Sequence, residues 1–268
     1  MERIKLKSRD LEILKALEKW GVLGLGQCEG LLFWRGIEME KRVDRFFNKA
    51  DRRIYNRYGG ERLLRLREAG LIRTLRFMNH PQFYCLSESG HEVLKQRGVA
   101  SQVGFTRVIS EDFLRHEMSV NAVGMVLQEL FDLRVTTERE RVEVKRLARL
   151  PHHNRLILSD LWVVNGPRPR AIEVERSKKS AAAYRKIWEA YKERMLEQFP
   201  EGVVLYLTMD APGLKKQLSA YAREWEMDFI YFAELKDFRS SMGRCQFAGF
   251  YEDDGFSFSN GRGGVLHK

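Results

Sequence analysis

The segment Gly202–Met209 constrains the fold most, because it reads GVVLYLTM and is almost continuously apolar. A strand with one wet face alternates apolar and polar residues, whereas a strand covered on both faces is apolar throughout. We therefore expect a central, doubly covered strand. Around it, the chain from about residue 111 to 235 reads helix, three strands, helix, strand, helix, strand. This order predicts an α/β layer structure with a mixed sheet.

The composition favours a soluble protein. The 268 residues suit one large domain or two ordinary ones. No apolar run is long enough to cross a bilayer, and the N-terminal segment lacks the apolar core of a secretory signal. Three distant cysteines, Cys28, Cys85 and Cys245, give no readable disulfide framework or zinc site. We expect a cytoplasmic protein with no membrane partner.

Positive charge is concentrated in one segment. The chain has a net charge of +10, and residues 41–76 hold 12 Lys and Arg against 4 Asp and Glu. A dense basic patch attracts polyanions and releases their counterions, which makes nucleic acid the leading partner. A solvated basic helix surface is the simpler alternative.

The N-terminal third predicts helices followed by a hairpin. Apolar spacing favours helices over about 8–20, 26–34, 38–50 and 61–69. Leu71–Phe77 and Phe83–Leu86 flank a turn, and a further helix starts after Ser87. The stretch RLLRLREAGLIRTLRF followed by FYCLSESGHEVL resembles a winged helix-turn-helix. This resemblance implies that residues 57–69 are a recognition helix for double-stranded DNA.

Arginine suits such a surface because its guanidinium group pairs bidentately with guanine edges and phosphate. Arg62 and Arg65 lie three residues apart, so we expect them to share one helical face. Arg73 and Arg76 would lie on the wing. The predicted DNA contacts are Arg52, Arg53, Arg57, Arg62, Arg65, Arg67, Arg73 and Arg76. A winged helix used for protein contacts is the alternative.

The order of elements in the second half resembles the PD-(D/E)XK nuclease fold. That family places an acid on its second core strand and an acid pair with a lysine on its third. Here Asp160 lies in the segment LILSDLWVV, and Glu173 lies in the later segment AIEVE. Glu117, on the preceding helix, matches the additional acid of some members. Glu175 stands where the family has lysine, so the positive group must come from elsewhere.

Metal-dependent hydrolysis of a phosphodiester needs carboxylates that hold a divalent ion. Glu173 and Glu175 point to one face of a strand because side chains alternate with period 2. With Asp160 they form the predicted cluster for Mg²⁺ or Mn²⁺, since Mg²⁺ prefers oxygen ligands. Lys178, Lys179 and Lys186 on the following segment are candidate basic groups. Carboxylates at strand ends are also often simply solvated or salt-bridged.

A narrower resemblance covers about residues 8–235. The winged helix, the segment LRHEMSVNAV, Asp160, the E-x-E strand and the helix with Lys186 and Tyr191 are similar to the replication-relaxation family. They are also similar to the C-type mobilisation relaxases of plasmids. This resemblance implies site-specific DNA binding and nicking at a mobile-element origin, with Asp160, Glu173 and Glu175 as metal ligands and Lys186 as their basic partner.

The predicted organisation has three parts. Residues 1–98 form a winged helix-turn-helix domain, residues 99–239 a PD-(D/E)XK nuclease-like domain, and residues 240–268 an unassigned tail. One hypothesis is a magnesium-dependent endonuclease or nickase. The other is a DNA-binding regulator or adaptor that retains a degenerate nuclease fold for homodimerisation or for docking to other mobile-element proteins.

Overall fold

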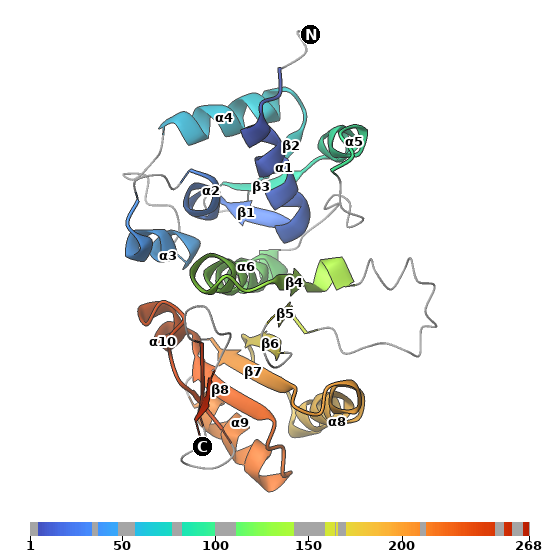
Figure 1. Ribbon diagram of the computed structural model, residues 1–268, viewed down its shortest axis with the longest axis vertical. Coiled ribbons are helices and arrows are strands. Elements are labelled where there is room, and N and C mark those ends of the chain that lie inside the picture. The colour runs from blue at the N-terminus through green and yellow to red at the C-terminus, as the bar shows by residue number, and fades with distance from the viewer. Residues whose placement is uncertain are drawn as a thin grey trace. The chain divides into compact units, whose positions relative to one another are not determined.

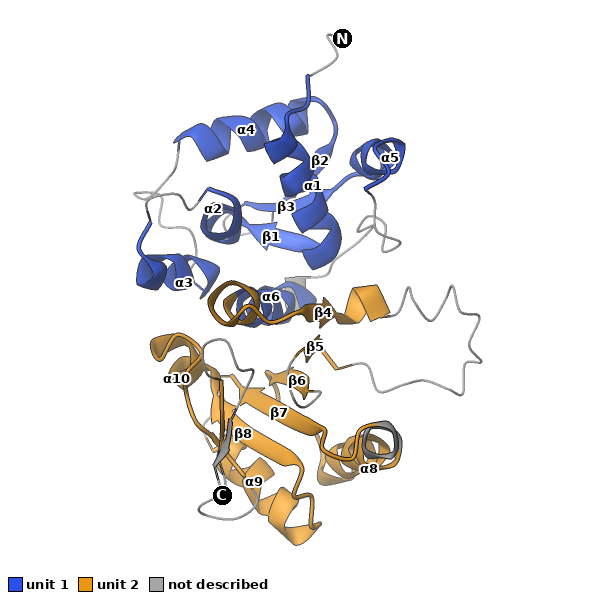
Figure 2. Ribbon diagram, viewed as in Figure 1, with its two compact units in different colours: residues 1–125 blue, residues 126–268 orange. Residues whose placement is uncertain are grey.

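The structure is a computed structural model that describes residues 5–33, 37–47, 57–76, 82–99, 111–141, 159–163, 165, 170–209, 213–249, 255–258 and 265–267. The chain forms two compact units, Met1–Met125 and Val126–Lys268 (Figure 2). Each unit has its own β-sheet and its own packed helices (Figure 1).

The first unit combines helices with a small antiparallel sheet. Its elements are α1 (Ser8–Trp20), β1 (Val22–Gly24), α2 (Leu25–Leu32), α3 (Met39–Phe47), α4 (Arg57–Glu68), β2 (Ile72–Leu75), β3 (Phe83–Leu86), α5 (Glu88–Gln96) and the first part of α6 (Glu111–Phe131). The strand order is β1-β3-β2, and both pairings are antiparallel. The predicted hairpin and its flanking helices are confirmed. Strand β1 was not predicted, because three residues carry no periodicity.

The first part of α6 packs within the first unit. The Asn121 side chain is buried and donates hydrogen bonds to the carbonyl oxygens of Trp20, at 2.9 Å, and Val22, at 2.8 Å. Leu114 joins Val22 and Phe83 in one apolar cluster. These contacts place the division between the units inside α6, at residues 125/126. The sequence suggested a division at residues 98/99 instead.

A buried ion pair fixes α4 against α1. Asp10 is fully buried, and both of its carboxylate oxygens accept hydrogen bonds from the Arg62 guanidinium group. Asp10 Oδ2 also accepts a hydrogen bond of 2.6 Å from the backbone N–H of Lys7, at the start of α1. Helix α4 ends at Glu68, and Gly70 in the turn that follows has a φ of +72°, a conformation that suits glycine.

The second unit is built on an eight-stranded mixed sheet in the order β11-β10-β9-β8-β7-β6-β5-β4. Strands β6, β7 and β8 are mutually parallel, and the other pairings are antiparallel. Its elements are β4 (Val135–Thr137), β5 (Leu161–Val163), β6 (Arg170–Glu175), α8 (Ala181–Gln198), β7 (Val203–Thr208), α9 (Leu214–Glu224), β8 (Ile230–Glu234), α10 (Leu235–Ser240), β9 (Phe247–Ala248), β10 (Gly255–Ser257) and β11 (Val265–His267).

Strand β7 lies at the centre of the parallel strands, and all six of its residues are buried. The expectation of a central, doubly covered strand is confirmed. Helices α8 and α9 cover one face, where Trp188 and Leu218 join Val204 and Tyr206 in one core cluster. Ala171 of β6 belongs to the same cluster, so the alternate residues Glu173 and Glu175 point toward this face.

Two expectations for this unit need correction. A strand was expected over Arg139–Leu147, but residues 138–141 are helical, and residues 142–150 lie outside the described residues. Thr137 and Glu140 explain the helical turn: Glu140 Oε2 accepts a 2.8 Å hydrogen bond from Thr137 N, and Thr137 Oγ1 accepts one from Glu140 N. This reciprocal pair is a capping box. The unassigned tail contributes β9, β10 and β11 to the sheet.

Within the part of the chain that the structure describes, no helix combines the length and apolarity that crossing a membrane requires.

We predict that Asp10→Ala destabilises the protein by about 3–5 kcal/mol, because it leaves the Arg62 guanidinium buried without its partner. Urea unfolding followed by tryptophan fluorescence measures this change. The control is Arg65→Ala, an exposed residue of the same helix, whose effect should stay within about 0.5 kcal/mol. Equal midpoints for the two variants would contradict a structural role for the ion pair.

Candidate functional site

Three carboxylates meet on neighbouring strands β5 and β6. Leu161 pairs with Ile172, so Asp160, one residue before β5, lies beside Glu173. Asp160 Oδ2 accepts a 2.7 Å hydrogen bond from the backbone N–H of Val174. The Asp160 side chain therefore reaches the stretch of β6 that carries Glu173 and Glu175. We call Asp160, Glu173 and Glu175 the carboxylate cluster.

The pKa of Glu173 is strongly raised. Removal from water raises its pKa well above the ordinary value, and the nearby charge of Asp160 raises it further. The Tyr191 hydroxyl of α8 donates a hydrogen bond to Glu173 Oε1, which partly offsets this rise. Tyr191 is itself buried, and its own pKa is raised by burial and by the charge of Glu173. The site therefore holds more negative charge than the protein around it readily stabilises.

Glu175 has a lysine partner four residues along the chain. Lys179 Nζ donates a hydrogen bond to Glu175 Oε2. The carboxylate of Glu175 is buried, while Lys179 keeps 43% of its side-chain surface exposed. The lysine therefore lies at the boundary between the cluster and solvent. Its ammonium group also lies 5.5 Å from the centre of the Tyr184 ring.

Arg141 is a second cation beside the cluster. Its Nη1 donates a 2.8 Å hydrogen bond to Ser159 Oγ, next to Asp160, and its guanidinium group lies 5.0 Å from the centre of the Trp162 ring. Burial lowers the pKa of Arg141, and the nearby Tyr191 and Glu173 act in the opposite direction. Lys179 and Arg141 thus bring positive charge to the carboxylates from two different segments.

The structure brings Asp160, Glu173 and Glu175 together, but not every residue predicted with them. Lys186 is exposed on α8, and no described contact joins it to the cluster. Lys179 occupies the place expected of Lys186. Glu117 lies on the part of α6 that belongs to the first unit, separate from the unit that holds the cluster. Sequence reasoning missed Arg141, although the T-x-x-E pattern before it signals the helical turn that carries it.

Two of the three carboxylates, rather than all three, are suited to binding Mg²⁺. Among the described residues, no three acidic, histidine or cysteine side chains converge closely enough to hold a metal ion. Glu175 already pairs with Lys179. Mg²⁺ usually takes one or two protein carboxylates and keeps several waters. Asp160 and Glu173 satisfy that requirement, and their mutual repulsion is the kind that a cation relieves.

The arginines predicted to contact DNA differ in the solvent exposure of their side chains. Arg57, Arg65, Arg73 and Arg76 are exposed, and Arg67 is half-buried. Arg57 Nε forms a 3.0 Å ion pair with Glu61. Arg62 was expected to share a face with Arg65, and this is wrong, because Arg62 is only 7% exposed and pairs with Asp10. Arg52 and Arg53 lie outside the described residues.

No protein-family model, curated protein or solved structure matches this chain.

We predict that Glu173→Gln becomes progressively stabilising, relative to the parent, as the pH rises above the ordinary pKa of a glutamate side chain, about 4.3. The folded-state pKa of Glu173 lies above its unfolded value, so the parent loses stability as the pH rises through the interval between them. Glutamine cannot ionise, and its amide oxygen still accepts the Tyr191 hydrogen bond. Urea unfolding at several pH values measures the difference.

Glu193→Gln serves as the control, since this carboxylate is exposed on α8, the helix that carries Tyr191. A stability difference between Glu173→Gln and the parent that stays constant over the pH range would show that Glu173 ionises freely in the folded protein.

Proposed function

We propose that this chain binds DNA and cuts or nicks it with a divalent metal ion, as part of a mobile genetic element. The observation that carries the proposal is the meeting of Asp160, Glu173 and Glu175 with Lys179 at the ends of neighbouring strands. These are the residue types that phosphodiester hydrolysis requires: carboxylates for a cation, and a positive group for the phosphate.

The order of strands in the second unit supports the proposal. Strands β4, β5 and β6 form an antiparallel run, and β7 joins β6 in parallel after helix α8. This agrees with the resemblance to the PD-(D/E)XK fold, in which the single acid lies on the second core strand and the acid pair on the third. Asp160 directly precedes β5, and Glu173 and Glu175 lie on β6.

In the proposed reaction, Asp160 and Glu173 would hold Mg²⁺ or Mn²⁺, and the ion would polarise the phosphoryl group and lower the pKa of a bound water. Tyr191 fixes the orientation of Glu173 through its hydrogen bond. Glu175 holds Lys179 at the solvent boundary, where the ammonium group faces an approaching phosphate. Lys179 therefore takes the role that the family gives to a lysine on the strand itself.

The first unit supports the DNA-binding part of the proposal. Helices α1, α2, α3 and α4 precede the β2–β3 hairpin, and β1 pairs with β3. This order agrees with the resemblance to a winged helix-turn-helix. Arg65 on α4 and Arg73 and Arg76 at β2 are exposed for contact with double-stranded DNA. In this proposal Arg62 holds the helix and does not read bases.

A second candidate function is a non-catalytic DNA-binding regulator or adaptor. The observation that favours it is that each carboxylate already has a partner within the protein. Asp160 accepts from Val174 N, Glu173 accepts from Tyr191, and Glu175 pairs with Lys179. On this alternative the second unit serves homodimerisation or docking to other mobile-element proteins, and the cluster only stabilises the fold.

We predict that Asp160→Asn abolishes metal-dependent cleavage while DNA binding stays within about twofold of the parent. Asparagine keeps an oxygen that can accept the Val174 hydrogen bond, so the change removes charge with little effect on the fold. Supercoiled plasmid carrying the protein's own genomic neighbourhood is the substrate, incubated with Mg²⁺, Mn²⁺ or EDTA. Gel mobility of the same DNA in EDTA measures binding.

The reciprocal variant is Arg65→Ala with Arg73→Ala, which should weaken DNA binding by about 1–3 kcal/mol for each base contact removed. Equal cleavage by Asp160→Asn and the parent rules out the carboxylate cluster as the catalytic site. Shifted but intact plasmid with every metal supports the adaptor instead.

A further inference from the structure

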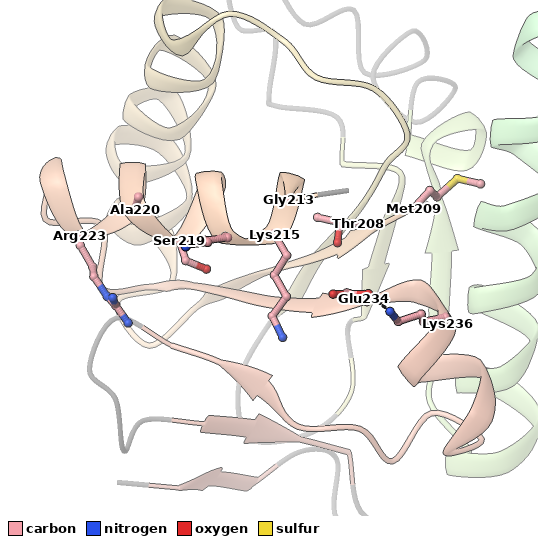
Figure 3. A pocket seen from close by; sticks show the side chains of 10 residues that line it. Thr208, Met209, Gly213, Lys215, Ser219, Ala220, Arg223, Glu234 and Lys236 are labelled. Atoms are coloured by element: carbon pink, nitrogen blue, oxygen red, sulfur yellow. Dashed lines mark ion pairs between the residues drawn. The ribbon is translucent and has the colours of Figure 1, made fainter. Parts of the chain in front are cut away.

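A basic pocket lies beside the carboxyl ends of β7 and β8, under helix α9 (Figure 3). Its volume is about 790 Å³. Among the described residues that line it, Glu234 is the single carboxylate, and the cationic side chains are Lys215, Lys216, Arg223 and Lys236. An open pocket with this excess of positive charge attracts anions.

The α9 sequence builds this charged face by helical spacing. Leu214, Leu218 and Ala222 are buried in the core at intervals of four residues. The residues directly after them, Lys215, Ser219 and Arg223, line the pocket at the same interval. Each interval corresponds to about 6 Å along the helix axis. Figure 3 shows Lys215 and Arg223 extending from α9 in the same direction.

Glu234 does not neutralise the pocket. It forms an ion pair of 2.7 Å with Lys236, which leaves the three cations of α9 to act on a ligand. The hydrogen bond from Lys236 lowers the pKa of Glu234, and the charge of Lys215 contributes in the same direction. Ser219 and Thr208 add hydroxyl groups to the lining. Cations with hydroxyl donors around an open pocket fit phosphate oxygens.

A row of paired residues across the sheet connects the pocket to the carboxylate cluster. Glu175 pairs in register with Thr208, and Thr208 pairs with Glu234. The three residues therefore form a row across β6, β7 and β8 on the face that α8 and α9 cover. Neighbouring strands lie about 4.8 Å apart, so the row spans about 10 Å. Glu175 belongs to the cluster, and Thr208 and Glu234 line the pocket.

We propose that this pocket is a phosphate-binding subsite, in which Lys215 and Arg223 hold backbone phosphates of the nucleic-acid strand whose scissile phosphate lies at the carboxylate cluster. The assignment to a strand rests on the proposed function, whereas the affinity for phosphate rests on the pocket alone. The same chemistry would accept the phosphates of a free nucleotide, and the two sources are separated below.

The test compares the full-length parent with the double variant Lys215→Gln and Arg223→Gln. The probe is a short fluorescein-labelled oligothymidylate, and binding is followed by fluorescence anisotropy in EDTA over a range of salt concentrations. We expect the variant to bind about tenfold more weakly. We also expect the slope of log affinity against log salt to become shallower by about 1.4, because each lost phosphate contact on a single strand contributes about 0.7.

Lys192→Glu is the matched control. It lowers the net charge by the same two units, but on the exposed side of α8, outside the pocket. The control should bind within about twofold of the parent and keep the parent's slope. If the double variant and the control have the same affinity and slope, and neither differs from the parent in binding thymidine diphosphate, the proposal is overturned.

Calorimetry with thymidine diphosphate and with inorganic phosphate identifies the source of the phosphate. Weaker oligothymidylate binding by the double variant supports the binding of a nucleic-acid strand in the pocket. Loss of thymidine diphosphate binding alone, with oligothymidylate binding unchanged, keeps the phosphate site and assigns it to a free nucleotide. None of these binding measurements depends on cleavage. If the chain never cuts DNA, the proposed nuclease is refuted but the phosphate-binding pocket is not. If the parent cuts DNA and the double variant binds every probe as the parent does, the pocket is refuted but the nuclease is not.

Discussion

The close approach of Asp160 and Glu173 is the constraint that determines how the site in the second unit is arranged. Two carboxylates on neighbouring strands approach each other on a face covered by helices, where water stabilises their charges poorly. Backbone and side-chain groups offset this cost. Val174 N–H donates to Asp160, the Tyr191 hydroxyl donates to Glu173, and Arg141 lies nearby. A fold selected for stability alone would be expected to place apolar residues here, which is why we assign the cluster a function.

Periodicity in the sequence predicted the framework of both units but did not say which helical face is buried. Six consecutive apolar or hydroxyl residues placed β7 at the sheet centre, and period 2 placed Glu173 and Glu175 on one face. The same reasoning failed for Arg62. Spacing groups residues by face, but the burial of Arg62 is decided by Asp10, which lies 52 residues earlier in the chain.

The sequence was also not enough to identify which lysine contacts the carboxylate cluster. Lys178, Lys179 and Lys186 were all candidates, and the family resemblance selected Lys186. In the structure α8 begins at Ala181, so Lys179 precedes the helix. A residue in that connection can turn back to the strand end, whereas an exposed residue on the second turn cannot be placed by spacing alone. The tail escaped prediction for another reason. Strands β9, β10 and β11 have two or three residues each, which is too few to show alternation. Only their pairing in the sheet defines them, with β9 beside β8, β10 beside β9 and β11 beside β10.

The central claim is that Asp160 and Glu173 together hold a divalent cation. The most direct measurement is electron paramagnetic resonance of free Mn²⁺ titrated into the protein, with the parent and Asp160→Asn compared at equal concentration. The account predicts that the parent removes one equivalent of Mn²⁺ from solution and that Asp160→Asn removes much less. Equal binding by the two proteins, or none by either, would contradict it.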